Sequence, residues 1–335
     1  MVNNVTLRPA DISFPTTKQQ TILEAANAGK VILRHGCVAG ICRVCKLKLI
    51  SGSIEYIPGA SVCLTADEIK ENYFLPCCAI AKSDLICATS MHNSGGGTSQ
   101  YQKEGVVVIY KEQKGSVFIL RLKLSRHTMI ASESGQYIEV EVGGNVFRSY
   151  SIANIPQRDG YIELHIQTRQ GGMFSGLLKN SIKLNDVLWV RGPFGSFTLD
   201  KTSKRNLLFV ATGTGFSPVQ SMLLSGAINS ERIIHLYWGG RVYEDLFFLK
   251  AVLALKKEYM NFYFHPVLSK PAPADNWKGK VGYVQDCVVD KIGCLEDFDV
   301  YACGSAAMIR EAFRLFTTKC NLPADQFYSD AFYSS

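Results

Sequence analysis

The chain has 335 residues, of which 47% are hydrophobic and 19% are charged, a composition typical of a globular protein with two or three domains. The formal net charge is +7, but the basic residues are scattered, which argues against nucleic-acid binding. No apolar run approaches the roughly 18 residues of a membrane-spanning helix, and residues 1–14 lack the pattern of a secretion signal. We therefore expect a cytoplasmic protein that binds neither nucleic acid nor membrane.

Residues 1–90 predict a small domain of mixed α and β structure. Val5 and Leu7 alternate with polar residues, as strands do. Thr21 and Glu24 form a capping-box pattern that predicts a helix from Ile22 to Ala28, ended by Gly29. A glycine- and serine-rich run follows, so we assign residues 91–104 to a flexible linker.

Residues 105–200 are rich in short strands separated by turn residues, a pattern typical of an antiparallel barrel. The predicted strands are Val106–Tyr110, Val117–Leu124, Tyr137–Val142, Phe147–Ile152, Tyr161–Gln167 and Val187–Arg191.

Residues 201–335 alternate between strands and helices, which predicts a parallel sheet with helices on both faces. The predicted strands are Leu207–Ala211, Ile233–Trp238, Phe262–Leu268, Phe298–Ala302 and Phe327–Phe332, and the predicted helices are Pro218–Leu224 and Asp245–Tyr259.

Eleven cysteines are many for a chain without an export signal, and metal or redox chemistry explains them better than disulfides. Cys37, Cys42 and Cys45 have the x4/x2 spacing of plant-type [2Fe–2S] ferredoxins, which need a fourth cysteine further along the chain. That ligand is either Cys77 or Cys78. The alternative is structural zinc, which usually uses Cys-x2-Cys pairs. Six cysteines match no ligand pattern, and we expect most to be small buried hydrophobes: Cys63, Cys78, Cys87, Cys287, Cys294 and Cys320.

Two motifs in the predicted barrel favour a bound anion. Arg148-Ser149-Tyr150-Ser151 stands at a strand end, and Gly171-Gly172-Met173-Phe174-Ser175 precedes a predicted helix, Gly176–Lys179. An arginine, a glycine turn and a helix N-terminus together form an anion site, and Tyr150 offers a flat ring against which a flavin can pack. Each motif alone is more often structural, and their order and spacing give them weight.

Three predicted strand ends in the last domain carry small or polar residues. Gly213-Thr214-Gly215-Phe216-Ser217-Pro218 follows the first buried strand, and such a turn directs N–H groups at a pyrophosphate. Tyr237-Trp238-Gly239-Gly240-Arg241 ends the next strand, and Cys303-Gly304-Ser305 follows a later one. A buried cysteine before a helix cap is the plainer explanation of Cys303.

With these motifs the chain resembles the ferredoxin–NADP reductase-like superfamily in its three-module form. This resemblance implies a ferredoxin-like (β-grasp) domain over residues 1–90, an FAD-binding barrel over 105–200 and an NAD(P)H-binding α/β domain over 201–335. Leu75-Pro76-Cys77-Cys78 followed by Lys82-Ser83-Asp84-Leu85 is similar to the family's closing region, which makes Cys77 the fourth cluster ligand. The whole chain is most similar to the reductases of 3,6-dideoxyhexose biosynthesis.

The resemblance also implies roles for individual residues. Arg148, Gly172 and Ser175 would bind the FAD pyrophosphate, Tyr150 and His165 would contact the flavin, and Ser151 would hydrogen-bond near flavin N5. Cys303 would lie beside nicotinamide C4, with Asp330 and Phe332 approaching the flavin from the C-terminus. The remaining nucleotide-binding residues would be Gly213, Thr214, Gly239, Arg241 and Gly304. Arg241 suits a 2′-phosphate, but Glu244 and Asp245 would repel one, so NADH is favoured over NADPH.

Such a protein would take hydride from NAD(P)H onto FAD and pass single electrons through the cluster to a partner enzyme. The partner would be a PMP-dependent iron–sulfur dehydrase or, alternatively, an aromatic-ring-hydroxylating oxygenase. A hypothesis from another class is a non-catalytic zinc-binding protein, which leaves the flavin and nicotinamide motifs unexplained. Arg43 replaces the family's usual glycine after the second loop cysteine, and Gly240-Arg241 is closer to general flavin reductases.

Overall fold

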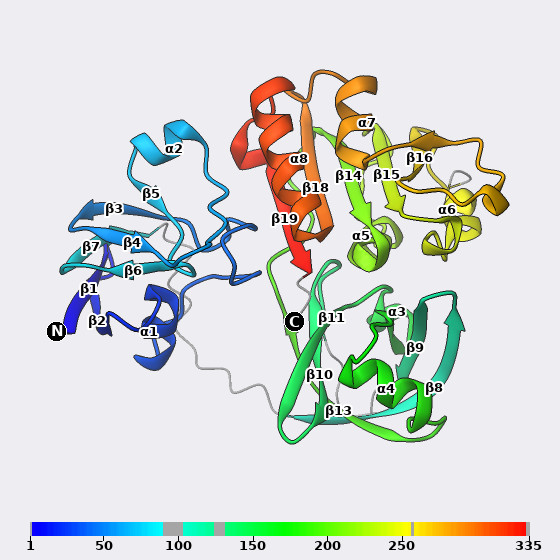
Figure 1. Cartoon of the computed structure of the whole chain (residues 1–335), viewed down its shortest axis with the longest axis horizontal. Helices are drawn as coiled ribbons and strands as arrows, with labels where there is room; N and C mark the ends of the chain where they lie inside the picture. Colours follow the sequence, from blue (N-terminus) through cyan, green and yellow to red (C-terminus); the bar gives the residue numbers. More distant parts are fainter. Residues whose placement is uncertain (1, 90–102, 124–130, 256–257, 333–335) are drawn as a thin grey trace. The chain divides into compact units, whose positions relative to one another are not determined.

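The computed structural model describes residues 2–89, 103–123, 131–255 and 258–332 (Figure 1). The chain divides into two compact units, residues 1–100 with 329–331 and residues 101–328 with 332–335. Most of the predicted linker lies outside the described residues, and Glu104 already belongs to a strand. No helix in the described segments is long and apolar enough to cross a membrane.

The first unit is a β-grasp domain, in which one helix packs on a mixed sheet of strand order β2-β1-β7-β3-β5. Its elements are β1 (Val2–Arg8), β2 (Ile12–Thr17), α1 (Ile22–Ala28), β3 (Leu47–Ser51), β4 (Ile54–Tyr56), α2 (Ala66–Lys70), β5 (Tyr73–Phe74), β6 (Ala79–Ala81) and β7 (Leu85–Ala88). The predicted capping box of α1 is confirmed, because Thr21 Oγ1 accepts the Glu24 N–H at 3.2 Å and Glu24 accepts the Thr21 N–H at 2.8 Å. Ile22, Leu23, Ala25 and Ala26 of this helix join the buried core.

The second unit begins with an antiparallel barrel of strand order β11-β10-β13-β8-β9-β12. Its elements are β8 (Glu104–Lys114), β9 (Val117–Lys123), β10 (Tyr137–Gly143), β11 (Val146–Ser151), α3 (Pro156–Asp159), β12 (Tyr161–Gln167), α4 (Met173–Asn180) and β13 (Val187–Phe194). A bridge between Ile152 and Leu164 joins the two ends of this order, after β11 and within β12. Phe174 and Leu178 of α4 pack into the barrel core.

After the barrel the chain forms a six-stranded parallel sheet of strand order β17-β16-β15-β14-β18-β19. Its strands are β14 (Asn206–Thr212), β15 (Ile234–Gly240), β16 (Phe262–Leu268), β17 (Lys280–Val281), β18 (Phe298–Ser305) and β19 (Phe327–Phe332), and its helices are α5 (Phe216–Leu224), α6 (Leu249–Leu255), α7 (Val284–Lys291) and α8 (Ala306–Lys319). Helices α5 and α6 share one core with alternate residues of β14 and β15, while α7 and α8 cover the other face (Figure 1).

Three helix predictions differ from the structure in this unit. The predicted helix from Asp245 to Tyr259 is wrong at both ends, since α6 begins only at Leu249 and Glu258 and Tyr259 are not helical. The Asp245 carboxylate instead accepts the Arg241 N–H at 2.7 Å, and such local side-chain bonds compete with helix formation. Helix α5 begins two residues before Pro218, which the first turn tolerates, and α4 begins at Met173 rather than Gly176.

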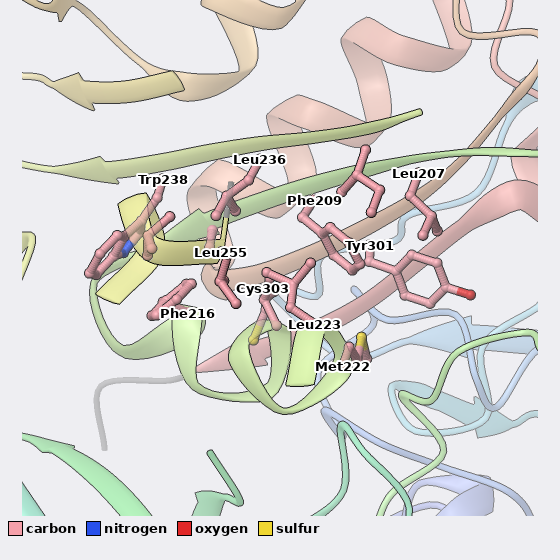
Figure 2. Packing of buried hydrophobic residues seen from close by; sticks show 14 of the residues in the cluster. Leu207, Phe209, Phe216, Met222, Leu223, Leu236, Trp238, Leu255, Tyr301 and Cys303 are labelled. Atoms are coloured by element: carbon pink, nitrogen blue, oxygen red, sulfur yellow. The ribbon is translucent and has the colours of Figure 1, made fainter. Parts of the chain in front are cut away.

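The core beneath the parallel sheet has Phe209 near its centre (Figure 2). Its ring is fully buried and lies 5.6 Å from that of Tyr301 between ring centroids. We expect Phe209→Ala to lower the free energy of unfolding by about 3–5 kcal/mol, because it removes buried apolar contacts and leaves a cavity. Urea denaturation followed by circular dichroism measures this change. Leu253→Ala, on the half-exposed side of α6, is the control and should change the value by about 0.5 kcal/mol or less. Equal losses in both variants would contradict the assigned core.

Candidate functional site

The cysteine loop holds its sulfurs in two pairs within the first unit. The Cys37 N–H donates to Cys42 Sγ at 3.2 Å, and the Cys42 N–H donates to Cys37 Sγ at 3.2 Å. The Ile41 N–H adds a third bond, to Cys37 Sγ at 3.4 Å. These N–H groups face sulfur because the loop wraps tightly, so the backbone is already arranged to stabilise negative charge on Cys37.

Cys45 and Cys77 form the second pair. Hydrogen bonding by Cys45, followed by that of Cys78, lowers the pKa of Cys77 to about 3. In the first pair, hydrogen bonding by Cys42 lowers the pKa of Cys37 to about 6. The pKa of Cys42 and of Cys45 is raised in return, because each retains the shared proton. Two pairs of thiols that stabilise thiolate fit a [2Fe–2S] cluster, in which two thiolates bind each iron.

Cys78 is buried beside the second pair, with its sulfur 4.0 Å from Cys77 Sγ and 3.6 Å from the Leu75 carbonyl oxygen. Its bond to Cys77 raises its pKa, so it carries a proton next to the Cys77 sulfur. In the described part of the chain, no three His, Cys, Asp or Glu side chains converge as ligands of one metal ion. The cysteines outside the loop are buried, as predicted for most of them, and Cys294 is the exposed exception.

Gly40 explains how the loop can close around these sulfurs. Its φ is +76°, a conformation that other residues rarely adopt. A Cβ here would lie 1.8 Å from the Ser61 carbonyl oxygen and 2.9 Å from Cys78 Sγ. Only glycine therefore fits at this position.

The flavin motifs come together at one side of the barrel, around Tyr150. Burial raises the pKa of Tyr150 to about 12, against the opposing charges of Arg148 and Arg169. Its ring lies 5.3 Å from that of Phe174 at the start of α4, between ring centroids. Gly172, at the N-terminal cap of α4, provides no side-chain hydrogen bond to the helix.

Two guanidinium groups and an uncapped helix N-terminus beside one aromatic ring suit an anion attached to a flat ring system. Ser175 braces this turn, because its Oγ accepts the Arg169 N–H at 3.0 Å. Ser151 is buried at the end of β11. The structure thus brings Arg148, Tyr150, Gly172 and Ser175 to one region, which fits FAD, although their individual contacts with it stay predictions.

A cavity of about 600 Å³ lies at the carboxyl ends of the parallel strands. Its size suits a nucleotide. Its lining includes the predicted nucleotide-binding residues Gly213, Thr214, Gly239, Arg241 and Gly304. It also includes Phe332, which was predicted to approach the flavin, and Gln167 and Arg169 from the barrel. Cys303 is fully buried and stands directly before the lining residue Gly304. Asp330 lies two residues before Phe332 on β19, so the two share a strand face.

Two glycines hold the turns of this cavity in close contact. A Cβ on Gly215 would lie 2.2 Å from the Cys303 carbonyl oxygen, and one on Gly304 would lie 2.2 Å from Thr212 Oγ1. Trp238 Nε1 donates to the Gly213 carbonyl oxygen at 3.0 Å. The backbone of the turn can therefore approach a ligand closely, as pyrophosphate binding requires.

Two cavity residues at the start of α7 belong to no motif that can be recognised in the sequence. Gln285 is 6% exposed, and its Oε1 has no hydrogen-bond partner among the described residues. Tyr283, two residues earlier, is exposed and also lines the cavity. A buried amide oxygen without a partner is costly unless a ligand satisfies it, which favours a bound molecule here. Arg169 was likewise missed, because it stands outside the recognised glycine motif.

His165 does not line the cavity. Its ring is buried, with Nε2 3.1 Å from Glu163 Oε1 and Nδ1 3.0 Å from Ser217 Oγ. Burial lowers its pKa, and its ring stacks on Phe248 at 4.8 Å between centroids. Ser217 Oγ also lies 2.8 Å from the Thr214 carbonyl oxygen, so His165 connects the barrel to the glycine turn. Its predicted flavin contact remains a prediction.

Comparison with protein families finds three matches in chain order. A 2Fe-2S iron-sulfur cluster binding domain matches residues 5–82, an oxidoreductase FAD-binding domain matches 106–199, and an oxidoreductase NAD-binding domain matches 209–313. These matches cover the cysteine loop, the barrel motifs and the cavity turns in that order. They support [2Fe–2S], FAD and a nicotinamide nucleotide as the cofactors.

Relatives match over nearly the whole chain. The CDP-6-deoxy-L-threo-D-glycero-4-hexulose-3-dehydrase reductase of Yersinia pestis is 34% identical, covering 99% of both chains. The phenol hydroxylase P5 protein of Acinetobacter pittii is 32% identical, covering 93% of this chain and 89% of the relative. The crystal structure of the Amycolatopsis cytochrome P450 reductase GcoB has a TM-score of 0.69 at 26% identity, covering 98% of each chain. The chain therefore belongs to the ferredoxin–NADP reductase-like family in its three-module form, as an oxidoreductase that joins a [2Fe–2S] ferredoxin domain to FAD- and NAD-binding domains.

Proposed function

We propose that this oxidoreductase is a CDP-6-deoxy-Δ3,4-glucoseen reductase, which delivers electrons from NADH to a PMP-dependent iron–sulfur dehydrase of 3,6-dideoxyhexose biosynthesis. The observation that carries the electron-transfer function is the pair of cysteine thiolate sites in the same chain as the nucleotide cavity. The pathway is supported by the Yersinia pestis relative, whose name specifies a hexulose-3-dehydrase reductase. The phenol hydroxylase relative is nearly as similar, so the reductase of an aromatic-ring oxygenase is the second candidate.

We assign each group of residues to one task. When bound, FAD accepts hydride from the nicotinamide, and the cluster carries single electrons. Arg148, Gly172 and Ser175 hold the pyrophosphate of the flavin nucleotide, and Tyr150 supports its ring. Ser151 donates a hydrogen bond at the reacting edge. Cys37, Cys42, Cys45 and Cys77 are the four cluster ligands.

The nicotinamide nucleotide binds in the cavity of the second unit. The turn at Gly213 and Thr214 presents backbone N–H groups to its pyrophosphate, and Gln285 supplies an amide to its polar groups. Cys303 and Asp330 are assigned to the hydride-transfer end.

NADH is the proposed donor because of one carboxylate. Asp245 lines the cavity beside Arg241, and its Oδ2 lies 3.7 Å from Arg241 Nε. This carboxylate partly neutralises Arg241, the cation expected to face a 2′-phosphate. A cytoplasmic location is proposed with this function, since cluster ligands must be reduced thiolates.

The test is an anaerobic preparation whose visible spectrum and EPR spectrum are recorded before and after addition of NADH. We expect flavin and iron–sulfur absorption that bleaches with NADH, and an EPR signal of reduced [2Fe–2S]. A colourless protein containing zinc would refute the redox function and favour the zinc-binding alternative.

The acceptor is tested with the same preparation. Purified dehydrase with its CDP-hexulose substrate should oxidise NADH through this protein, while a phenol-type oxygenase should not. The reverse result would reject the dideoxyhexose pathway and support the second candidate.

A further inference from the structure

Arg43 is an unusual residue at the centre of the cysteine loop. It stands between Cys42 and Cys45 with a φ of +64°, a conformation that favours glycine. The contacts of the Arg43 side chain must therefore explain why an arginine occupies this position.

The side chain of Arg43 is buried and shares the carboxylate of Glu68 with Lys46. Arg43 Nη2 and Lys46 Nζ each lie 2.5 Å from Glu68 Oε1. Only 6% of the Arg43 side chain and 12% of the Glu68 side chain are exposed. Two positive side chains, those of Arg43 and Lys46, therefore share the Glu68 carboxylate next to the loop.

Glu68 is fixed from a second direction. Its Oε2 accepts the Thr65 N–H at 2.9 Å, and Thr65 Oγ1 accepts the Glu68 N–H at 3.2 Å, which caps α2. These bonds fix the position of the Glu68 carboxylate, and the carboxylate in turn fixes the position of the Arg43 guanidinium. Burial also keeps Arg43 from contacting a partner protein, so partner recognition does not explain it.

We propose that Arg43 raises the reduction potential of the [2Fe–2S] cluster and that Glu68 limits this effect. The proposal rests on the assignment of Cys37, Cys42, Cys45 and Cys77 as cluster ligands. Reduction adds one negative charge to a cluster that four thiolates already make negative. A positive charge in a poorly solvated site favours the more negative state, and net charge is among the factors that set such potentials. Because a guanidinium stays protonated in proteins, this effect does not depend on pH.

The experiment is a redox titration of the holoenzyme, with the cluster followed by EPR. Arg43→Gln should lower the midpoint potential of the cluster, Arg43→Lys should change it less, and Glu68→Gln should raise it. Glutamine can replace glutamate in a capping box, so Glu68→Gln should keep α2 intact. Lys70→Gln is the matched control, because Lys70 is on the same helix with 76% of its side chain exposed and its charge is screened by water.

Opposite shifts for Arg43→Gln and Glu68→Gln, both larger than in the control, would support the proposal. Shifts of the same sign, or shifts no larger than that of Lys70→Gln, would overturn it and leave Arg43 as a structural brace. If Arg43→Gln loses the cluster, Arg43→Gly, which suits the backbone conformation, replaces it in the titration. A wild-type protein without any [2Fe–2S] EPR signal would instead refute the cluster assignment itself.

Discussion

Cys77→Ala should abolish the [2Fe–2S] cluster, whereas Cys78→Ala should retain it. The reason lies in the pairing of the sulfurs: Cys77 shares a hydrogen bond with Cys45, and its pKa falls to about 3, as suits a thiolate ligand. Cys78 keeps its proton and contacts the Leu75 carbonyl oxygen. Iron and sulfide analysis with EPR of the reduced protein measures cluster content directly.

Reduction of the flavin by NADH distinguishes specific loss of the cluster from general misfolding of the variant. In Cys77→Ala, NADH should still bleach the flavin, because the barrel and the nucleotide cavity belong to the second unit. Electron delivery to the partner enzyme should be lost. Cys320→Ala, which alters a buried cysteine near the C-terminal end of α8, should leave both cofactors in place. A cluster that survives in Cys77→Ala but not in Cys78→Ala would make Cys78 the ligand.

Features set by local sequence could be predicted closely. Helix α1 begins and ends as its capping box and Gly29 indicate, and strands β12, β16 and β19 have the predicted bounds. These elements combine a clear apolar period with turn residues at both ends. The start of helix α6 could not be predicted from the apolar period. The Asp245 carboxylate accepts a hydrogen bond from the backbone of Arg241, and the helix begins only after this turn.

The candidate site could be predicted from the sequence where a short motif determines the backbone conformation. The glycine turn after β14 and the Cys303-Gly304 pair both lie at the cavity or directly beside it. Gln285 could not be found, because its position depends on α7 packing against β14 and β15. The same holds for Glu68, which meets Arg43 across 25 positions of the chain. Contacts of this kind follow from tertiary packing and leave no short pattern in the sequence.

Gly215→Ala should reduce the rate of flavin reduction by NADH by about a hundredfold or more. The added Cβ would lie 2.2 Å from the Cys303 carbonyl oxygen and 2.5 Å from its carbon, and both atoms are backbone. The glycine turn must therefore separate from the end of β18, which displaces a nucleotide bound in the cavity. Misplacement by about 1 Å can slow a reaction by this factor, because the reacting atoms lose their alignment.

Stopped-flow measurement of flavin bleaching at saturating NADH tests this expectation, with dithionite reduction as the reference. Dithionite needs no nucleotide site, so it should reduce the flavin and the cluster of Gly215→Ala as in the wild type. The control is Gly226→Asn, just beyond the other end of α5, where φ is +68° and a Cβ meets no atom within 4 Å. Asparagine tolerates that conformation, so NADH reduction should be unchanged.

If Gly215→Ala reacts with NADH at the wild-type rate, the contact between the turn and β18 does not position the nucleotide. A variant slow with dithionite as well would show that the substitution disturbs the flavin instead, which would refute a role confined to the nicotinamide cavity.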